Sequence, residues 1–232
     1  MSPDAPFFAE GDLALVRLLQ IVSPALPIGA FAYSQGLEQA VAEGWVTDER
    51  EAAGWLLGLL ESSFGTLDLP VLARLIVAWR AGDPVAVARW SAWLCACRPT
   101  REIRAEDRLL GAALARVLET LGIDEAKPWS AHLQVTHPTM FALGAARFEV
   151  PLGAALAGYG FSWAEAITSA AVRLVPLGQS AGQRVLAAAG RAIPAVVKRA
   201  LELPDDELGS TAPGQAIASA RHETLYSRLF RS

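Results

Sequence analysis

The sequence predicts an all-α protein, a single-domain bundle of about ten helices. Apolar residues recur at the spacing of one helix face through most of the 232 residues. No segment alternates as a half-buried strand does, and no hairpin dipeptide such as Asn-Gly is present. We expect a flexible N-terminus over residues 1–11, an all-helical domain over residues 12–225 and a C-terminal tail over residues 226–232.

The predicted helices of the first half each carry one apolar stripe. Thr47 can cap a helix whose first turn holds Asp48 and Glu49. The pair Asp83-Pro84 places proline where a helix begins. The stripes are formed by Leu15, Leu18, Leu19 and Val22; by Ala53, Leu56, Leu57 and Leu60; by Leu69, Leu72, Ala73 and Ile76; and by Ala86, Trp90, Trp93, Leu94 and Cys97.

The second half continues in the same way. Ser162–Glu165 and Ser180–Gln183 both fit the capping box that opens a helix. Val172–Val175 is the best strand candidate, and we assign it to a helix end because proline follows. Residues 203–210 form a polar, turn-rich link before a last short helix. Further stripes are formed by Leu110, Leu114, Val117, Leu118 and Leu121, and by Ile167, Ala170, Ala171 and Leu174.

The composition is unusually apolar. The chain is 53% hydrophobic, which indicates a large core or apolar surface reserved for a partner. Its net charge of -4 shows no basic excess of the kind that binds nucleic acid. Two cysteines are too few for a disulfide framework, so we expect a reducing compartment, the cytoplasm.

One uncharged stretch is long enough to be considered as a membrane-spanning segment. No charge falls between Arg17 and Glu38, and this length would span a bilayer. Prolines, glycines, serines and glutamines interrupt it, so a continuous lipid-facing helix is not expected. The N-terminus has neither the basic nor the apolar region of a signal peptide. We therefore expect no membrane association.

Within that stretch, Ser23–Glu38 is predicted to be a packed loop. Pro24 and Pro27 fix φ and remove donors, whereas Gly29 and Gly36 allow angles that other residues avoid. A solvated linker would not carry so much apolar surface. The apolar side chains presented between these residues are Ile28, Phe31 and Tyr33.

The C-terminal tail is also apolar. Tyr226, Leu229 and Phe230 would be costly to expose, and Arg228 and Arg231 flank them. A tail of this composition either packs on its own domain or becomes ordered when a partner binds. Aromatic residues beside arginine are typical interface anchors.

A serine hydrolase is one alternative reading of the sequence. Gly178–Gly182 matches the G-x-S-x-G elbow, with Ser180 as nucleophile and Asp205 and His222 following in hydrolase order. The context argues against it, because no run of parallel strands and no glycine-rich oxyanion loop precede the motif. We expect Ser180 to be a helix cap and the protein to lack catalytic residues.

A resident metal has little support. Cys95 and Cys97 do not share a helix face, and His132 and His137 straddle a proline boundary. No CxxC pair and no HExxH sequence occurs. We expect no cofactor.

The segment Arg98–Arg108 is dense in charge. Arg101, Arg104 and Arg108 fall on one helix face. They could dock an acidic partner or supply an arginine to a GTPase, and the plainer reading is a solvated helix face.

Three segments in the same order resemble the F-type urease accessory proteins, the UreF family. They are Leu18–Glu38, Ala170–Gln183 and Arg221–Ser232, and together they extend over most of the chain. The resemblance implies an all-helical, dimeric, non-enzymatic cytoplasmic protein. The partners it implies are the D-type accessory protein (called H in some organisms), the G-type GTPase and apo-urease. Nickel would at most be in transit.

The resemblance also implies roles for residues. In this family the tail becomes ordered on D-type binding, and Arg228 would help to form the surface that recruits the GTPase. We expect Phe31, Tyr33 and the tail to share one partner-facing surface. The expected partner-binding residues are Pro27, Gly29, Phe31, Tyr33, Arg221, Tyr226, Arg228, Leu229 and Phe230.

A GTPase-activating protein is the second function that the resemblance leaves open. Such a protein would insert an arginine into the active site of the G-type GTPase and raise its rate by about 10³–10⁵. An exposed arginine has the same sequence pattern in a scaffold and in an activator, so the two remain alternatives.

Overall fold

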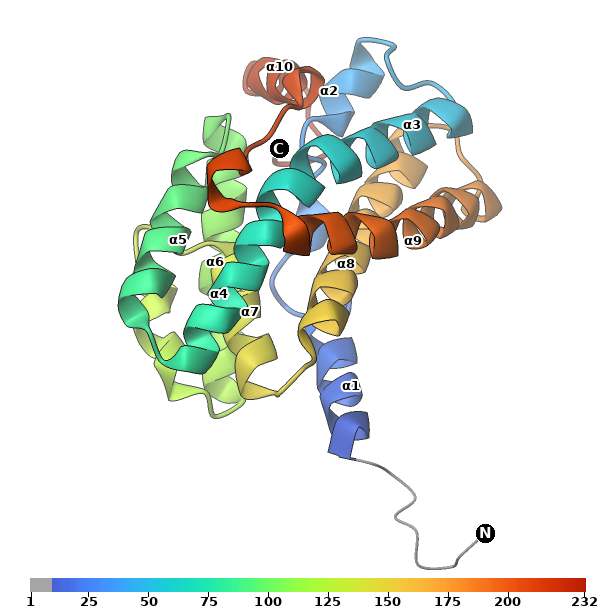
Figure 1. Ribbon diagram of the computed structural model, residues 1–232. Coiled ribbons are helices and arrows are strands. Elements are labelled where there is room, and N and C mark those ends of the chain that lie inside the picture. The colour runs from blue at the N-terminus through green and yellow to red at the C-terminus, as the bar shows by residue number, and fades with distance from the viewer. Residues whose placement is uncertain (1–9) are drawn as a thin grey trace, which may run out of the picture.

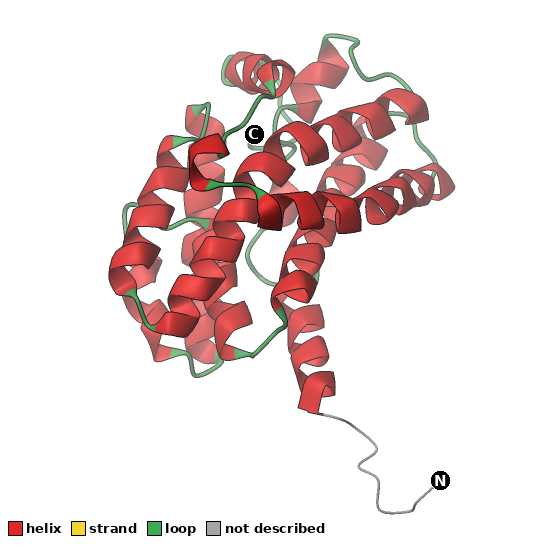
Figure 2. Cartoon of the chain, viewed as in Figure 1, coloured by secondary structure: helices red, strands yellow, loops and turns green. Residues whose placement is uncertain are grey.

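The computed structural model describes residues 10–232 and confirms the all-α prediction (Figures 1 and 2). Ten α-helices and no β-strand occur in this span. The helices are α1 (Glu10–Ile21), α2 (Leu37–Ala42), α3 (Glu49–Leu59), α4 (Leu69–Ala81), α5 (Pro84–Ala96), α6 (Arg101–Thr120), α7 (His137–Arg147), α8 (Leu152–Leu174), α9 (Gln179–Glu202) and α10 (Pro213–His222). The other helical segments are η1 (Ala30–Ala32), the π-helical η2 (Leu60–Asp68), η3 (Asp124–Ala131) and η4 (Asp205–Glu207).

The core forms around α4, because this helix is apolar on nearly every side. Its Leu72, Leu75 and Ile76 are fully buried. The helices α5, α7, α8 and α9 all pack against it (Figure 1). One cluster of buried apolar side chains extends from Leu18 in α1 to Phe230 in the tail, so the described residues form a single domain.

The helices α3 and α4 are joined by η2 into one helix, Glu49–Ala81. Two separate helices were expected here, and the π-helical join carries Asp68 into the interior. By length and composition this is the one helix among residues 10–232 that could cross a membrane, and 67% of its most apolar window is buried in the domain. The uncharged stretch Arg17–Glu38 is interrupted by a loop after Ile21.

Helix starts agree with the sequence where proline marks them. Asp83 caps α5 through the amide of Ala86, and Pro84 is the first residue of that helix. At α3 the N-cap is Asp48, one residue after the expected Thr47, and Thr47 bonds the Glu51 carboxylate instead.

Both capping-box predictions are wrong. Ser162–Glu165 lies inside α8, which starts directly after Pro151 because the residues that follow pack into the core. Ser180 lies in the first turn of α9, and the N-cap is Gly178, which has no side chain to donate or accept. The assignment of Val172–Val175 to a helix end is confirmed, since α8 ends at Leu174.

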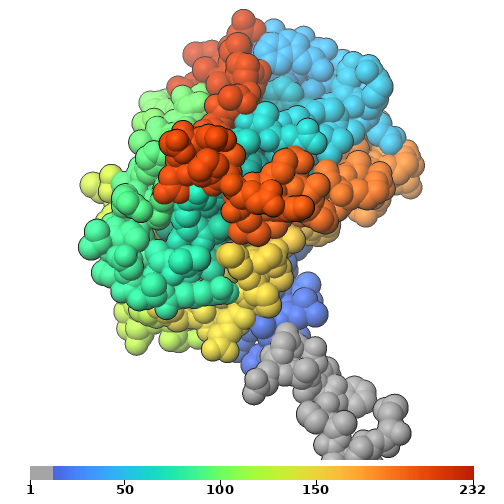
Figure 3. All heavy atoms as spheres, in the orientation of Figure 1, coloured from blue at the N-terminus to red at the C-terminus, as the bar shows by residue number. Residues whose placement is uncertain are grey.

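The two ends of the chain differ in what the structure shows. Residues 1–9, most of the N-terminus expected to be flexible, lie outside the described residues, and α1 begins at Glu10. At the other end α10 packs against α2 (Figure 3). The tail that follows α10 turns back into the domain and buries Phe230.

Candidate functional site

The opening loop, residues 22–36, connects α1 to α2. Gly29 and Gly36 adopt left-handed backbone angles, with φ of 81° and 87°, as the sequence predicts. A Cβ at Gly36 would lie 3.0 Å from the amide nitrogen of Ser219, so this glycine allows α10 to approach the loop. Gln35 also has a positive φ, 53°, which the sequence did not indicate.

The C-terminal tail lies against this loop. The Arg231 amide donates to the Ala32 carbonyl at 2.8 Å, and the Ser34 amide donates to the Ser232 carbonyl at 2.9 Å. The Ser34 hydroxyl also donates to the Ser232 carbonyl, across 198 residues of sequence. Of the two alternatives for the tail, the structure thus shows the form that packs on its own domain.

Four side chains of the loop and the tail are exposed. Phe31, in η1, is 71% exposed, Leu229 is 57% exposed and Tyr226 is fully exposed. Arg228 is partly exposed, and its Nη1 donates to Oε1 of Glu102 at 2.7 Å. We call Phe31, Tyr226, Arg228 and Leu229 the loop–tail surface.

The other expected partner-binding residues lie elsewhere. Tyr33 and Phe230 are buried in the domain, so neither side chain is part of the exposed loop–tail surface. The guanidinium of Arg173 lies 5.0 Å over the Phe230 ring, and this contact holds the tail against α8. Pro27 and Arg221 are exposed, and Gly29 supplies the turn before η1.

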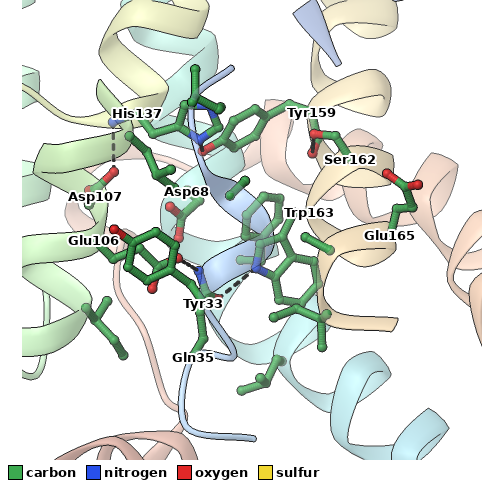
Figure 4. Close-up of a pocket in the computed structure, with 18 of the residues that line it drawn as sticks. Tyr33, Gln35, Asp68, Glu106, Asp107, His137, Tyr159, Ser162, Trp163 and Glu165 are labelled. Carbon is green, nitrogen blue, oxygen red and sulfur yellow. Dashed lines mark hydrogen bonds between the residues drawn. The ribbon is translucent and has the colours of Figure 1, made fainter. Parts of the chain in front are cut away.

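A cavity of about 170 Å³ lies beneath the opening loop (Figure 4). Gln35 links its two sides: Nε1 of Trp163 donates to Oε1 of Gln35 at 2.9 Å, and Nε2 of Gln35 donates to Glu106 at 2.7 Å. Trp163 stacks on Phe64 with ring centroids 4.5 Å apart. The side chain of Gln35 thus connects the loop to α6 and α8.

The polar end of the cavity holds a buried ionic cluster. Arg98 donates to Asp68 and to Asp107, at 2.7 Å each. Asp107 also accepts the backbone N–H of His137 at 2.8 Å. Burial, together with the charge of Arg98, lowers the pKa of His137 to about 4, so this imidazole is neutral near pH 7. Its Nδ1 lies 3.2 Å from the Tyr159 hydroxyl.

Glu106 connects the cavity to the tail. The Ser232 hydroxyl donates to Glu106 at 2.7 Å, opposite the bond from Gln35. Burial raises the pKa of Glu106 to about 7 in spite of these two hydrogen bonds. The tail therefore touches a carboxyl group whose charge changes near neutral pH.

Sequence reasoning missed these buried charges, although one signal was present. Glu106 and Asp107 stand between Ile103 and Leu110 at the positions that continue an apolar helix stripe. A carboxylate at such a position is buried and needs a partner. Here the partners come from segments distant in sequence, which periodicity does not identify.

The charge-dense segment divides into two parts. Arg101, Arg104 and Arg108 are exposed on α6, after Thr100 caps the helix through the amide of Ile103. This agrees with a solvated helix face. Arg98, by contrast, lies inside the domain.

The structure contradicts the serine hydrolase alternative. His222 is fully buried, and its ring nitrogens face the carboxylates of Glu38 and Glu102. Asp205 bonds to an arginine of α4. Neither residue contacts Ser180, which is exposed in the first turn of α9 and follows a helix rather than a strand.

The two cysteines lie at the C-terminal end of α5. Cys95 and Cys97 are free thiols, and burial raises the pKa of Cys97, which disfavours the thiolate that metals bind. Within residues 10–232, no group of three His, Cys, Asp or Glu side chains is arranged to hold a metal ion.

Comparisons with known proteins point to one family. The family model described as UreF matches residues 46–190. A urease accessory protein UreF from Alkalilimnicola ehrlichii is 49% identical over 220 residues, which cover 95% of this chain and 96% of the relative. UreF proteins of the same description from Pseudomonas putida and Azoarcus sp. are 48% and 47% identical, covering 96% and 97% of this chain and 100% and 98% of the relatives.

Proposed function

This chain belongs to the UreF family of urease accessory proteins, and from that premise we propose that it is the scaffold subunit of a urease maturation complex. It binds a D/H-type accessory protein, recruits a G-type GTPase and presents the assembly to apo-urease. Nickel is the cargo of this complex. The subunit performs no catalysis and holds no resident cofactor.

The loop–tail surface is the observation that carries this proposal. Phe31 and Leu229 expose apolar area that water solvates poorly, and Arg228 adds a charged group beside them. Aromatic residues and arginine dominate the binding energy of protein interfaces. The surface is built from a backbone pairing of loop and tail, so it is preorganised for binding.

We further propose a cytoplasmic homodimer, on the basis of the family resemblance. Exposed aliphatic side chains along one helix support this, because an apolar helix face needs a cover. They lie on α1: Leu13, Leu15, Val16 and Leu19.

Light scattering after size-exclusion chromatography tests the scaffold proposal. The chain is purified alone and with its cognate D-type and G-type proteins, with and without GTP. We expect a stable complex with the D-type protein that then takes up the GTPase. A chain that remains free of both partners under every condition would overturn the proposal.

A GTPase-activating role is a second candidate, because Arg228 reaches the surface and could extend toward a bound GTPase. Single-turnover GTP hydrolysis with and without the chain separates the two roles. A rise of about 10³-fold or more indicates an inserted arginine. A change of only a few-fold favours the scaffold. The hydrogen bond from Arg228 to Glu102 supports the scaffold role, because inserting Arg228 into a GTPase active site would break this bond.

A further inference from the structure

The cavity beneath the opening loop combines apolar walls with one polar end. The apolar walls come from four parts of the fold: Leu26 and Ile28 of the loop, Phe64 of η2, Leu110 of α6 and Trp163 of α8. An engineered apolar cavity of about 150 Å³ binds benzene, and this cavity measures about 170 Å³. Its size therefore suits one aromatic ring with a short substituent.

The polar end contains a polar atom that lacks a partner. His137 lines this end, beside Tyr159 (Figure 4). The Nε2 atom of His137 is buried and has no hydrogen-bond partner among residues 10–232. Because burying a polar atom without a partner is costly, Nε2 marks the place where the polar group of a ligand fits.

The Tyr159 hydroxyl determines which ring nitrogen of His137 carries the proton. Burial raises the pKa of Tyr159, so the hydroxyl keeps its proton, and its hydrogen-bond partner is Nδ1 of His137 at 3.2 Å. A neutral imidazole has one N–H, and Nδ1 is the acceptor here, so the proton lies on Nε2. The ligand group that fits this end is therefore a hydrogen-bond acceptor.

The charges around the polar end favour a neutral acceptor. The carboxylates of Asp68 and Asp107 share one cation, Arg98, so the cluster has an excess of negative charge. A carboxylate or phosphate on the ligand would be repelled by that excess. A cationic ligand group offers no acceptor to the Nε2 proton. A carbonyl oxygen satisfies both conditions.

We propose that this cavity is a binding site for a neutral aromatic molecule with one carbonyl oxygen, about the size of acetophenone. The ring packs against the apolar walls, where Phe64 and Trp163 offer aromatic faces. The carbonyl oxygen accepts the Nε2 proton of His137. Because the opening loop forms one wall, a bound ligand stabilises that loop. The site goes beyond the proposed scaffold function and does not depend on it.

Titration of the purified chain with acetophenone, followed by ¹H–¹⁵N spectra, tests the site. We expect the indole signal of Trp163 to shift as the ligand binds. Ala166→Leu places a larger side chain in the cavity wall and should weaken binding by about tenfold or more. Ala154→Leu makes the same change on the exposed side of α8, outside the cavity, and should bind as wild type does.

The hydrogen bond to His137 is tested with a matched pair of ligands. α-Methylstyrene has the shape of acetophenone, with a methylene group in place of the carbonyl oxygen. His137→Phe removes the donor and keeps an aromatic ring. We expect the ratio of the two dissociation constants, hydrocarbon over ketone, to fall by about tenfold in this variant. If the variant does not fold, the Nε2–H signal of wild type decides, because it should move downfield with acetophenone and less with α-methylstyrene.

Three results would overturn the proposal. The first is no binding of acetophenone to wild type, which would mean that the cavity holds water alone. The second is an unchanged affinity in Ala166→Leu, and the third is an unchanged ratio in His137→Phe or, where that variant does not fold, equal shifts of the Nε2–H signal. All measurements use the chain alone, so a chain that binds acetophenone but recruits no protein partner would remove the scaffold function and leave this site intact.

Discussion

At the scale of single residues, the side chains around the cavity are arranged so that buried charges are paired. Asp68 and Asp107 are almost fully buried, and Arg98 is the cation that binds both. Removing ions from water is costly, so such a cluster is stable only while its charges are paired. Arg98 is therefore a structural residue in a segment whose other arginines face solvent.

We predict that Arg98→Ala lowers the free energy of unfolding by about 3–5 kcal/mol, because two buried carboxylates lose their partner. Urea unfolding measures this. Arg108→Ala, on the exposed side of α6, is the matched control and should change stability by about 0.5 kcal/mol or less. Equal stability of the two variants would contradict the buried cluster.

Glu106 makes stability depend on pH. Its pKa rises from 4.5 to about 7 on burial, so the folded protein holds a proton that the unfolded chain has lost. Its contribution therefore favours folding at low pH and is lost as pH rises through about 7. We predict that Glu106→Gln reduces the loss of stability between about pH 6 and pH 8, by at most about 3 kcal/mol. Urea unfolding at both pH values gives the difference, and an unchanged loss would reject this role for Glu106.

Residue identity predicts backbone requirements better than electrostatic ones. The left-handed angles of Gly29 and Gly36 follow from their residue type, and both are found. Gln35 has a positive φ where its side chain bonds to Trp163 and Glu106, which lie far away in sequence. No local pattern contains those partners.

At the scale of helices, a glycine is needed where a neighbouring segment packs so closely that a Cβ would not fit. A Cβ on Gly111 of α6 would lie 2.6 Å from the Thr136 carbonyl carbon, at the start of α7. Backbone cannot move aside as a side chain can. By contrast, a Cβ on Gly190 of α9 would meet nothing within 4 Å.

We predict that Gly111→Ala destabilises the protein by about 1–3 kcal/mol through overpacking of α6 on α7. The matched variant Gly190→Ala should be neutral or stabilising by up to about 1 kcal/mol, because alanine favours a helix interior. Thermal unfolding followed by circular dichroism compares the two. Similar unfolding temperatures for both would show that the helices are less closely packed than described.

The sequence predicts that α3 and α4 are helices, but it does not predict how these helices are joined. The apolar stripes predict α3 and α4 correctly, since each helix buries one face. The π-helical η2 that joins them depends on packing against α9, where a Cβ on Gly65 would lie 2.5 Å from Val196. The capping boxes in α8 and α9 failed for a related reason, because core packing extended α8 past a local stop signal.

At the scale of the whole molecule, the opening loop and the tail form one structure. The sequence identified both segments as apolar and out of place on a solvated surface. Their pairing through Ala32, Ser34 and the last two residues is a long-range contact, which periodicity cannot predict. Family resemblance suggested a shared surface, and the fold brings the two segments together while burying Tyr33 and Phe230 beneath it.

The affinity of the G-type GTPase for the complex of this chain with its D-type partner tests the central claim most directly. Wild type is compared with Arg228→Ala and with Arg108→Ala, an exposed arginine outside the loop–tail surface, at fixed salt. We predict that Arg228→Ala weakens binding by about tenfold or more, as expected for an interface arginine, while the fold and D-type binding persist. Arg108→Ala should bind as wild type does. Unchanged GTPase affinity in Arg228→Ala would contradict the assignment of the loop–tail surface as the recruitment site.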